Sequence, residues 1–412
     1  MSNRASAMTA IPLVDLQAAH TEVAAEIKAG LDGLMASAAF IKGEVTRAFE
    51  REYAAFVGVA HCVGVANGTD AVELALRASD VPAGAEVIMP ANTFVATAEA
   101  VVRAGARPAF ADVDPEHLLL DPRALEAVVS DEAEVVLPVH LFGQLAPMTA
   151  IAAVAERHAA VVLEDAAQAH GATQGGKPPG SFGLLAGVSF YPGKNLGAYG
   201  DAGAVLTESA ELARRVRLLG DHGAERRYEH ITIGFNSRLD AFQAVVLRAK
   251  LRRLAAGNQA RRLAAARYAE LLADLPGVIL PSAAPGNDHV WHLYAIRVPH
   301  RDAVLRRLRD EKIEAGIHYP VPVHLQPAFR YLGYGKGDFP VAESAAEQLL
   351  SLPLFPQITE EQQIRVASAI RSVLGQDTLG ELAGMSAHGG GTPSRAQSAG
   401  YVAASGRAEA AD

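Results

Sequence analysis

The chain has 412 residues, enough for two or three domains, and with half of them hydrophobic and a fifth charged it reads as an ordinary globular protein. The formal net charge of −9 argues against a general affinity for nucleic acid. Cys62 is the only cysteine, which excludes a disulfide framework, an iron–sulfur cluster and a cysteine zinc site. We therefore expect a protein of the reducing cytoplasm with no metal site.

Neither a secretory signal nor a membrane span is predicted. Residues 1–12 carry one arginine and no apolar core of signal-peptide length. The longest uncharged run, residues 135–155, contains Pro138, His140, Gln144 and Pro147, which is typical of a buried strand, a loop and a helix start.

The N-terminal part of the chain has helical periodicity. Residues 14–34 and 44–56 show the apolar spacing of amphipathic helices, with a break at residues 40–43. Such helices often pack on another domain or subunit, so we define residues 1–45 as an N-terminal arm.

Short apolar strands then alternate with helices of about three turns, which predicts an α/β fold with a mostly parallel central sheet covered on both faces by helices. We assign residues 46–250 to this large domain. Strands are predicted at residues 61–65, 86–89, 108–113, 135–141, 161–165, 188–191 and 203–207, and helices at 71–78, 93–104, 122–129, 148–158 and 211–219.

Three polar groups are predicted to meet at one edge of this sheet, because ligands bind beyond the carboxyl ends of the strands in such folds. Gly68 and Thr69 lie at a helix N-terminus, where free N–H groups favour an anion, although Thr69 or Asp70 can also be a plain helix cap. Asp165 ends a strand, and Lys194 follows another strand.

Lys194 lies in a loop that contains glycines at positions 193, 197, 200 and 203. A lysine in a dry, crowded loop is less readily charged and becomes a nucleophilic amine, which can form a Schiff base with an aldehyde. The alternative is a solvated surface lysine in a flexible turn, and the loop alone does not decide between the two.

The second half of the chain carries fewer signals. Residues 221–237 are polar and irregular, which indicates either a functional loop or a long surface loop. The arginines of the long helix that begins at Leu239 favour a solvated face over a nucleic-acid contact, given the acidic total. We predict a smaller α/β domain at residues 251–376, whose last helix covers residues 359–374, and a disordered tail at residues 377–412.

Four motifs follow one another along the chain: Asn67-Gly-Thr-Asp-Ala71, Glu164-Asp-Ala-Ala-Gln-Ala-His170, Ser189-Phe-Tyr-Pro-Gly-Lys-Asn-Leu-Gly197 and Gly234-Phe-Asn-Ser-Arg-Leu-Asp240. Together they resemble the motifs of the sugar aminotransferases often called the DegT or StrS group. Members of that group are pyridoxal 5'-phosphate enzymes of fold type I that aminate keto sugars carried on nucleoside diphosphates. The resemblance covers residues 11–375 and implies the same fold and cofactor, and a homodimer.

The resemblance also implies catalytic and cofactor-binding roles. Lys194 would hold the cofactor covalently and later move the proton, and Asp165 would keep the pyridine nitrogen protonated so that the ring can act as an electron sink. Phe94 would stack on the ring unless it is plain core, and Gln168 would lie near the ring hydroxyl unless it caps a helix.

Further residues are implied for the phosphate and the substrate. The phosphate would be bound by the amides of Gly68 and Thr69, by the Ser189 hydroxyl and by Asn236 of the neighbouring subunit, which makes the active sites composite. The positions that resemble the lining of the sugar pocket in this family are Tyr191, His318, Tyr319 and His324.

The loop sequence also suggests a substrate. Gly193 to Gly197, closing on Gly200-Asp-Ala-Gly203, is similar to the loop of 3-keto enzymes, whereas enzymes for 4-keto sugars more often carry Asn-Lys and Gly-Glu-Gly-Gly. We therefore expect a dTDP-linked 3-keto-6-deoxyhexose as acceptor and glutamate as donor.

Three alternatives to this interpretation exist. They are an aminotransferase for a 4-keto sugar, a sugar dehydratase of the same fold and a non-catalytic cofactor-binding regulator. The presence of Lys194 and the lack of further cysteines argue against the dehydratase. The lack of a basic helix-turn-helix domain before the core argues against the regulator.

Overall fold

The computed structural model describes residues 9–130 and 132–387, with side chains as far as Gly375. Its centre is a mixed sheet with the strand order β3-β2-β4-β5 in one half and β6-β8-β9-β1 in the other. The halves join where Val139 pairs in parallel with Asp165. The strands are β1 (His61–Val65), β2 (Glu86–Pro90), β3 (Arg107–Ala111), β4 (Ala133–Val136), β5 (Val161–Val162), β6 (Glu164–Asp165), β8 (Ala186–Ser189) and β9 (Gly203–Thr207).

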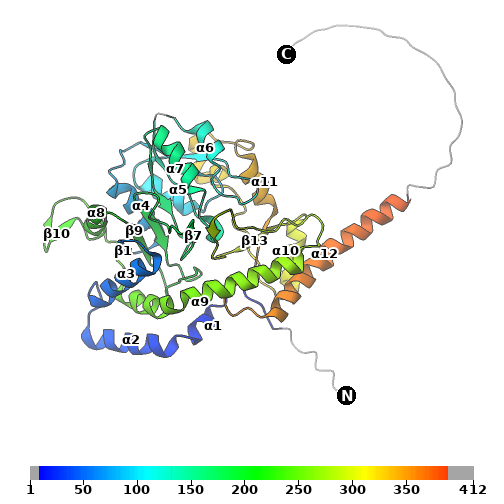
Figure 1. Ribbon diagram of the computed structural model, residues 1–412, viewed down its shortest axis with the longest axis horizontal. Coiled ribbons are helices and arrows are strands. Elements are labelled where there is room, and N and C mark those ends of the chain that lie inside the picture. The colour runs from blue at the N-terminus through cyan, green and yellow to red at the C-terminus, as the bar shows by residue number, and fades with distance from the viewer. Residues whose placement is uncertain (1–8, 131, 388–412) are drawn as a thin grey trace, which may run out of the picture.

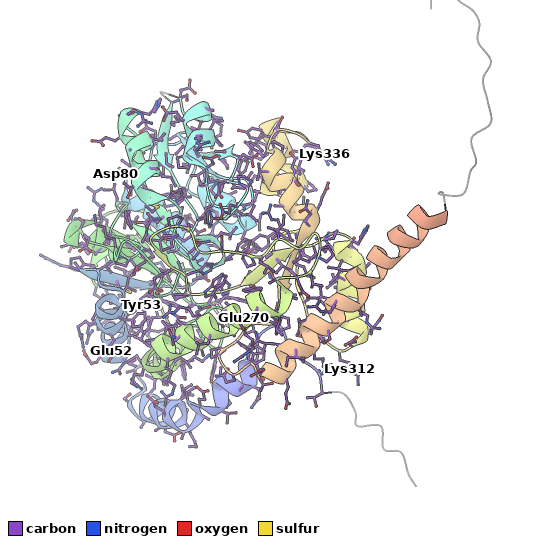
Figure 2. All side chains as sticks on the ribbon, turned by 45° about the vertical axis from the view of Figure 1, so that its right-hand side comes forward. Glu52, Tyr53, Asp80, Glu270, Lys312 and Lys336 are labelled. Carbon is purple, nitrogen blue, oxygen red and sulfur yellow. The ribbon has the colours of Figure 1, made fainter. Side chains whose placement is uncertain are left out.

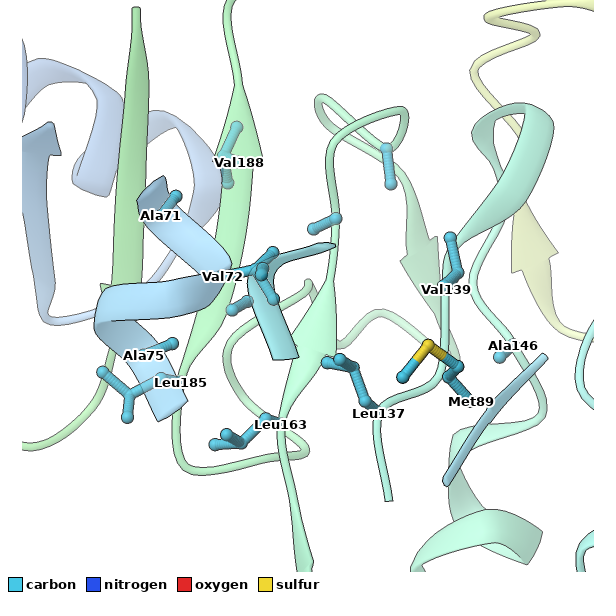
Figure 3. Close-up of a cluster of buried hydrophobic side chains, with 14 of the residues drawn as sticks. Ala71, Val72, Ala75, Met89, Leu137, Val139, Ala146, Leu163, Leu185 and Val188 are labelled. Atoms are coloured by element: carbon cyan, nitrogen blue, oxygen red, sulfur yellow. The ribbon is translucent and has the colours of Figure 1, made fainter. Parts of the chain in front are cut away.

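Most strand pairs of this sheet are parallel, which confirms the predicted fold class. The strands β3, β2, β4 and β5 pair in parallel, as do β6 and β8. Only β9 runs antiparallel to its two neighbours, β8 and β1. The sheet is buried by helices, and Figure 3 shows apolar side chains from β8 (Val188), from the chain after β4 (Leu137, Val139) and from α4 (Ala71, Val72) gathered in its core.

The helices of the large domain pack closely on this sheet. The helix α4 lies against α5, α8 and the strands β8 and β9. A side chain at Gly187 would not fit, because its Cβ would lie 2.8 Å from Cγ2 and 3.0 Å from the backbone nitrogen of Val72. The helices are α4 (Gly68–Ala78), α5 (Val95–Arg103), α6 (Pro122–Val128), α7 (Met148–Arg157) and α8 (Ala210–Gly220).

The long helix α9 (Ala241–Leu272) connects two hydrophobic cores and runs across the whole molecule in Figure 1. Leu247, Leu251 and Leu254 pack in the core of the large domain. Tyr268 and Leu272 pack in the second core. The predicted boundary between residues 250 and 251 therefore falls inside one continuous helix.

The second core belongs to the C-terminal part of the chain. The strands β13 (Tyr294–Arg297) and β14 (Leu349–Leu352) pair antiparallel beside α10 (Arg301–Asp310) and α12 (Glu360–Ala387). Figure 2 shows α12 packed across the end of α9 that Glu270 marks. Further elements are η1 (Leu141–Gly143), β7 (Thr173–Gln174), which pairs with β12 (Asn287–Asp288), the hairpin β10 (Ala224–Arg226) and β11 (Glu229–His230), η2 (Val323–Leu325), η3 (Pro327–Leu332) and α11 (Pro340–Gln348).

The N-terminal arm lies along α9. It contains α1 (Leu16–Thr21) and α2 (Ala24–Ser37) and leads into α3 (Glu44–Val57). Ile27 packs on Val246, and Leu34 packs on Val245. Gly30 allows this approach, since a Cβ there would lie 2.5 Å from Cγ1 of Val245. Figure 1 shows α2 below α9.

Several elements differ from their predicted extents by a few residues, and two helical regions differ most. The pattern over residues 14–34 forms two helices, because the chain leaves helical geometry between Thr21 and Ala24, where Val23 has φ −122° and ψ 0°. The last helix does not end at residue 374, and residues 377–387 of the predicted tail continue α12. Their Leu, Glu, Ala and Met residues are strong helix formers. The rest of the predicted tail, residues 388–412, lies outside the described residues.

No helix within residues 9–130 and 132–387 is long and apolar enough to cross a membrane.

Candidate active site

A cavity of about 650 Å³ opens at the carboxyl ends of the strands and gathers most of the predicted site residues. Those in its lining are Gly68, Thr69, Phe94, Asp165, Gln168, Ser189, Tyr191, Lys194 and Tyr319. A larger cavity of about 770 Å³, between α3 and α8, contains none of the predicted site residues. The site is therefore the smaller cavity.

The loop of Lys194 is bound to α9 by polar side chains. Asn258 accepts a hydrogen bond from Asn195 Nδ2 at 3.0 Å. Lys250 Nζ donates to the carbonyl oxygen of Gly197 at 2.7 Å. Gly197 must be glycine in this turn, because a Cβ would lie 2.2 Å from the carbonyl oxygen of Pro192.

A third contact holds the far end of the same loop. Gln243, near the start of α9, accepts a hydrogen bond at 2.8 Å from the backbone N–H of Tyr199. The Tyr199 hydroxyl is hydrogen-bonded in turn to Nδ1 of His20 in α1 of the arm. The loop that carries Lys194 thus follows the strand β8 and is held along its length by side chains of α9 and of the arm.

The Lys194 amine is partly buried and unusually easy to deprotonate. Burial lowers its pKa from 10.5 to about 8, and the nearby Asp165 carboxylate opposes this by raising it. About a tenth of the amine is therefore neutral at pH 7, against well under a thousandth for an ordinary lysine. Among the described residues, none lies at hydrogen-bonding or ion-pair distance from its Nζ.

Three histidines close to Lys194 are neutral. Burial lowers the pKa of His170 to about 3 and that of His318 to about 4, with the Lys194 charge adding to both effects. Burial also lowers the pKa of His292 well below its ordinary value. These imidazoles therefore add no positive charge beside the amine, and because their pKa values are lowered they are too weakly basic to compete with Lys194 for a proton.

Asp165 is a buried carboxylate that is hydrogen-bonded but has no cationic side chain paired with it in the described part of the chain. One oxygen, Oδ2, accepts from Thr97 Oγ1 at 2.7 Å, and Oδ1 accepts from the backbone N–H of Ala167 at 3.1 Å. Buried carboxylates are normally paired with a positive charge. A protonated ring nitrogen in the cavity would supply that charge.

The N-terminus of α4 and Ser189 form a place for an anion. Asn67 caps the helix by accepting from the backbone N–H of Asp70 at 2.8 Å, which leaves the N–H groups of Gly68 and Thr69 directed out of the helix end. A Cβ at Gly68 would lie 2.5 Å from Cβ and 2.9 Å from Oγ of Ser189. Only glycine lets the helix end approach the hydroxyl this closely, and both groups suit a phosphate.

Aromatic and amide side chains form the opposite wall. Half of the Phe94 surface is exposed, so Phe94 is not core, and its ring lies 5.2 Å from that of Tyr319. Gln168 donates to the Tyr319 hydroxyl at 3.2 Å and accepts from the backbone N–H of Phe142 at 2.6 Å. Burial raises the pKa of Tyr319, which keeps its hydroxyl protonated and able to donate into the cavity.

Three predicted site residues lie outside this cavity. Asn236 is exposed on its own chain and accepts from Arg238 Nη2 at 2.7 Å. His318 stands behind Lys194 and is hydrogen-bonded to Ser351 Oγ. His324 is fully buried between Phe110, Phe339 and Glu343 and does not reach this cavity.

The structure also reveals positioning residues that the sequence patterns did not identify. Thr97 contacts Asp165, and Lys250 and Asn258 hold the lysine loop. The Thr-x-x-x-Thr spacing of residues 93–97 is a weak signal for Thr97, and no pattern marks the polar face of α9.

Comparison with known proteins identifies one enzyme family. The sequence model of the DegT/DnrJ/EryC1/StrS aminotransferase family matches residues 21–371. A UDP-N-acetyl-3-dehydro-alpha-D-glucosamine 3-aminotransferase of Acidithiobacillus ferrooxidans is 47% identical over 89% of this chain and 98% of its own. A dTDP-3-amino-3,4,6-trideoxy-alpha-D-glucose transaminase of Streptomyces venezuelae is 43% identical over 90% of this chain and 98% of its own.

A solved structure is as similar to this chain in sequence as the Streptomyces venezuelae relative is. The crystal structure of S. venezuelae DesV in complex with a ketimine intermediate has a TM-score of 0.86 and 43% sequence identity, and the match covers 89% of this chain and 98% of that chain. The protein is thus an enzyme, a pyridoxal-phosphate-dependent aminotransferase of fold type I. It belongs to the DegT/DnrJ/EryC1/StrS family.

The lowered pKa of Lys194 generates a prediction about cofactor capture. The rate at which cofactor-free protein captures pyridoxal phosphate covalently should rise with pH, with a midpoint near 8, because only the neutral amine reacts. Asp165→Asn should move the midpoint down, because it removes the negative charge that favours the ammonium form. The absorbance of bound cofactor measures both, with Lys194→Ala as the blank. A midpoint at the ordinary value of 10.5 would contradict the burial argument.

Proposed function

We propose that the enzyme transfers an amino group from glutamate to the keto carbon of a nucleotide-linked sugar, as a homodimer in the cytoplasm. The observation that carries this proposal is the placement of Lys194 and Asp165 in the lining of one cavity, with the anion site of Gly68, Thr69 and Ser189 beside them. The names of the two relatives, both of which aminate nucleotide-linked sugars, support the substrate class.

Each residue of the cavity has a task toward the cofactor. Gly68, Thr69 and Ser189 would bind its phosphate, and Phe94 would stack on its ring. Asp165 holds the ring nitrogen protonated. Bound there, pyridoxal phosphate supplies a carbonyl that accepts amines and a ring that withdraws electrons from the carbon next to nitrogen.

Lys194 then performs the acid–base chemistry. Its amine, neutral in a useful fraction of molecules near pH 7, removes the proton from the α-carbon of glutamate and later returns a proton to the sugar carbon. Gln168 and Tyr319 position polar groups at the edge of the cavity, and Tyr191 lies where the substrate enters. His318 lies near enough to Lys194 to feel its charge and is itself uncharged, because burial lowers its pKa.

We further propose carbon 3 as the site of amination, in a dTDP-linked 3-keto-6-deoxyhexose. The loop from Gly193 to Gly203 is similar to that of 3-keto enzymes, and the names of both relatives place the amine at carbon 3. The two relatives differ in the nucleotide, which is UDP in one and dTDP in the other. The 6-deoxy sugar and the dTDP carrier rest on the motif resemblance.

The acceptor is tested by offering the enzyme dTDP-linked 3-keto and 4-keto hexoses in parallel with [¹⁵N]glutamate. We expect the label on carbon 3, located by NMR, and little or no product from the 4-keto sugar. Efficient amination of the 4-keto sugar alone would overturn the choice of carbon 3 and leave the aminotransferase reaction intact. A UDP-linked 3-keto sugar in a third reaction separates the choice of nucleotide from the choice of carbon.

We also propose that Asn236 completes the phosphate site of the partner subunit. Asn236 is exposed and lies outside the cavity of its own chain, so it is available to a second copy. The exposed apolar residues Phe40, Ile41 and Phe242, with Phe40 stacked on Phe242, lie where α9 begins and suit burial between two subunits.

Mixing inactive variants tests the composite site. In a mixed dimer of Lys194→Ala and Asn236→Ala chains, one site carries both defects and the other carries neither. Random exchange should therefore restore about a quarter of wild-type activity, because half of the dimers are mixed and each has one intact site. No recovery in confirmed mixed dimers would show that Asn236 serves its own chain.

A further inference from the structure

Two threonine hydroxyls form a buried chain that ends on Asp165. Thr93 and Thr97 are 2% and 1% exposed, and their Oγ1 atoms lie 2.8 Å apart. Thr97 Oγ1 lies 2.7 Å from Asp165 Oδ2. Thr93 comes just before Phe94, the N-cap residue of α5, and Thr97 lies in the first turn of that helix, so the bond between the two hydroxyls bridges the helix start.

The direction of the hydrogen bonds in this chain is fixed by the number of protons. An ionised carboxylate can only accept, so the single hydroxyl proton of Thr97 is donated to Asp165. The bond between the two hydroxyls must then be donated by Thr93. Hydrogen bonds joined in this way polarise one another, which strengthens the last bond of the chain.

Thr97 departs from what other helical hydroxyls of this protein do. Thr21, Ser37 and Thr46 each donate to the backbone carbonyl oxygen four residues earlier, the common way to satisfy a hydroxyl in a helix. Thr97 instead donates to a side chain that lies 68 residues away in the sequence. Its hydroxyl is therefore directed at the carboxylate, and the hydrogen bond serves Asp165 as well as the hydroxyl itself.

We propose that Thr97, backed by Thr93, is a positioning residue that fixes the plane of the Asp165 carboxylate against the cofactor ring. The Ala167 N–H holds the other oxygen, so both oxygens are tied to the protein and the carboxylate cannot turn away from the cavity. Phe94 lies between the two threonines and exposes its ring to the cavity. The segment of residues 93–97 thus positions both Phe94, which would stack on the ring, and Asp165, the partner of the ring nitrogen. The inference rests on the proposed role of Asp165.

The test compares four variants of the full-length enzyme. Thr97→Val keeps the shape of the side chain and removes the hydroxyl that donates to Asp165, whereas Thr97→Ser keeps that hydroxyl. Thr93→Val removes only the hydroxyl that donates to Thr97. Thr207→Val is the matched control, because Thr207 is equally buried and donates to the carbonyl oxygen of Leu184, away from the site. The readouts are the Kd of pyridoxal phosphate and the rate at which glutamate bleaches the bound cofactor, neither of which needs a sugar.

We expect Thr97→Val to raise the Kd about tenfold and to slow bleaching about tenfold to a hundredfold, with a smaller effect from Thr93→Val. Thr97→Ser should stay within about threefold of wild type, and Thr207→Val should match wild type in both readouts. Equal values for Thr97→Val and Thr207→Val would overturn the proposal, as would a Thr97→Ser enzyme as impaired as Thr97→Val.

Two further outcomes are informative. If Thr97→Val does not fold, Thr93→Val carries the test, and a wild-type Kd and bleaching rate in that variant would overturn the proposal. If wild-type protein binds the cofactor but glutamate does not bleach it, glutamate is not the donor. The Kd series then decides on Thr97 independently of the proposed function.

Discussion

The position of Lys194, the proposed catalytic residue, depends on the attachment of its loop to one face of α9. Gln243, Lys250 and Asn258 hold every second residue of the glycine-rich loop that follows Lys194. Side chains seven or eight residues apart on a helix lie on the same face, so a straight helix can bind an extended loop along its length. Glycines let this loop turn tightly, and without such contacts their freedom would leave the amine poorly placed.

The same helix links the loop of Lys194 to both hydrophobic cores. The N-terminal half of α9 packs in the core of the large domain and its C-terminal half in the second core. His292 and His318, from the C-terminal part of the chain, lie close enough to Lys194 to feel its charge. The C-terminal part therefore closes the back of the site, buries the amine and keeps its surroundings uncharged.

Much of the site could be predicted from sequence because its residues lie at strand ends and strand–helix junctions, which local sequence patterns mark. Strand ends such as Asp165, and glycines at strand–helix junctions such as Gly68, meet at one edge of a parallel sheet. Contacts between distant segments were beyond such reasoning. Neither the approach of Thr97 to Asp165 nor the burial of His324 follows from periodicity, since both depend on how separate elements pack. The extent of α12 was missed because Gly-rich composition outweighed its helix-forming residues.

The central claim is that Lys194 performs the proton transfers, and the half-reaction of cofactor-loaded Lys194→Ala with glutamate tests it most directly. Stopped-flow absorbance should show cofactor that still binds through the phosphate site but is converted at least about a thousandfold more slowly than in wild type. Lys336→Ala, at an exposed lysine marked in Figure 2, is the control and should react at the wild-type rate. Conversion at the wild-type rate in Lys194→Ala would contradict the account.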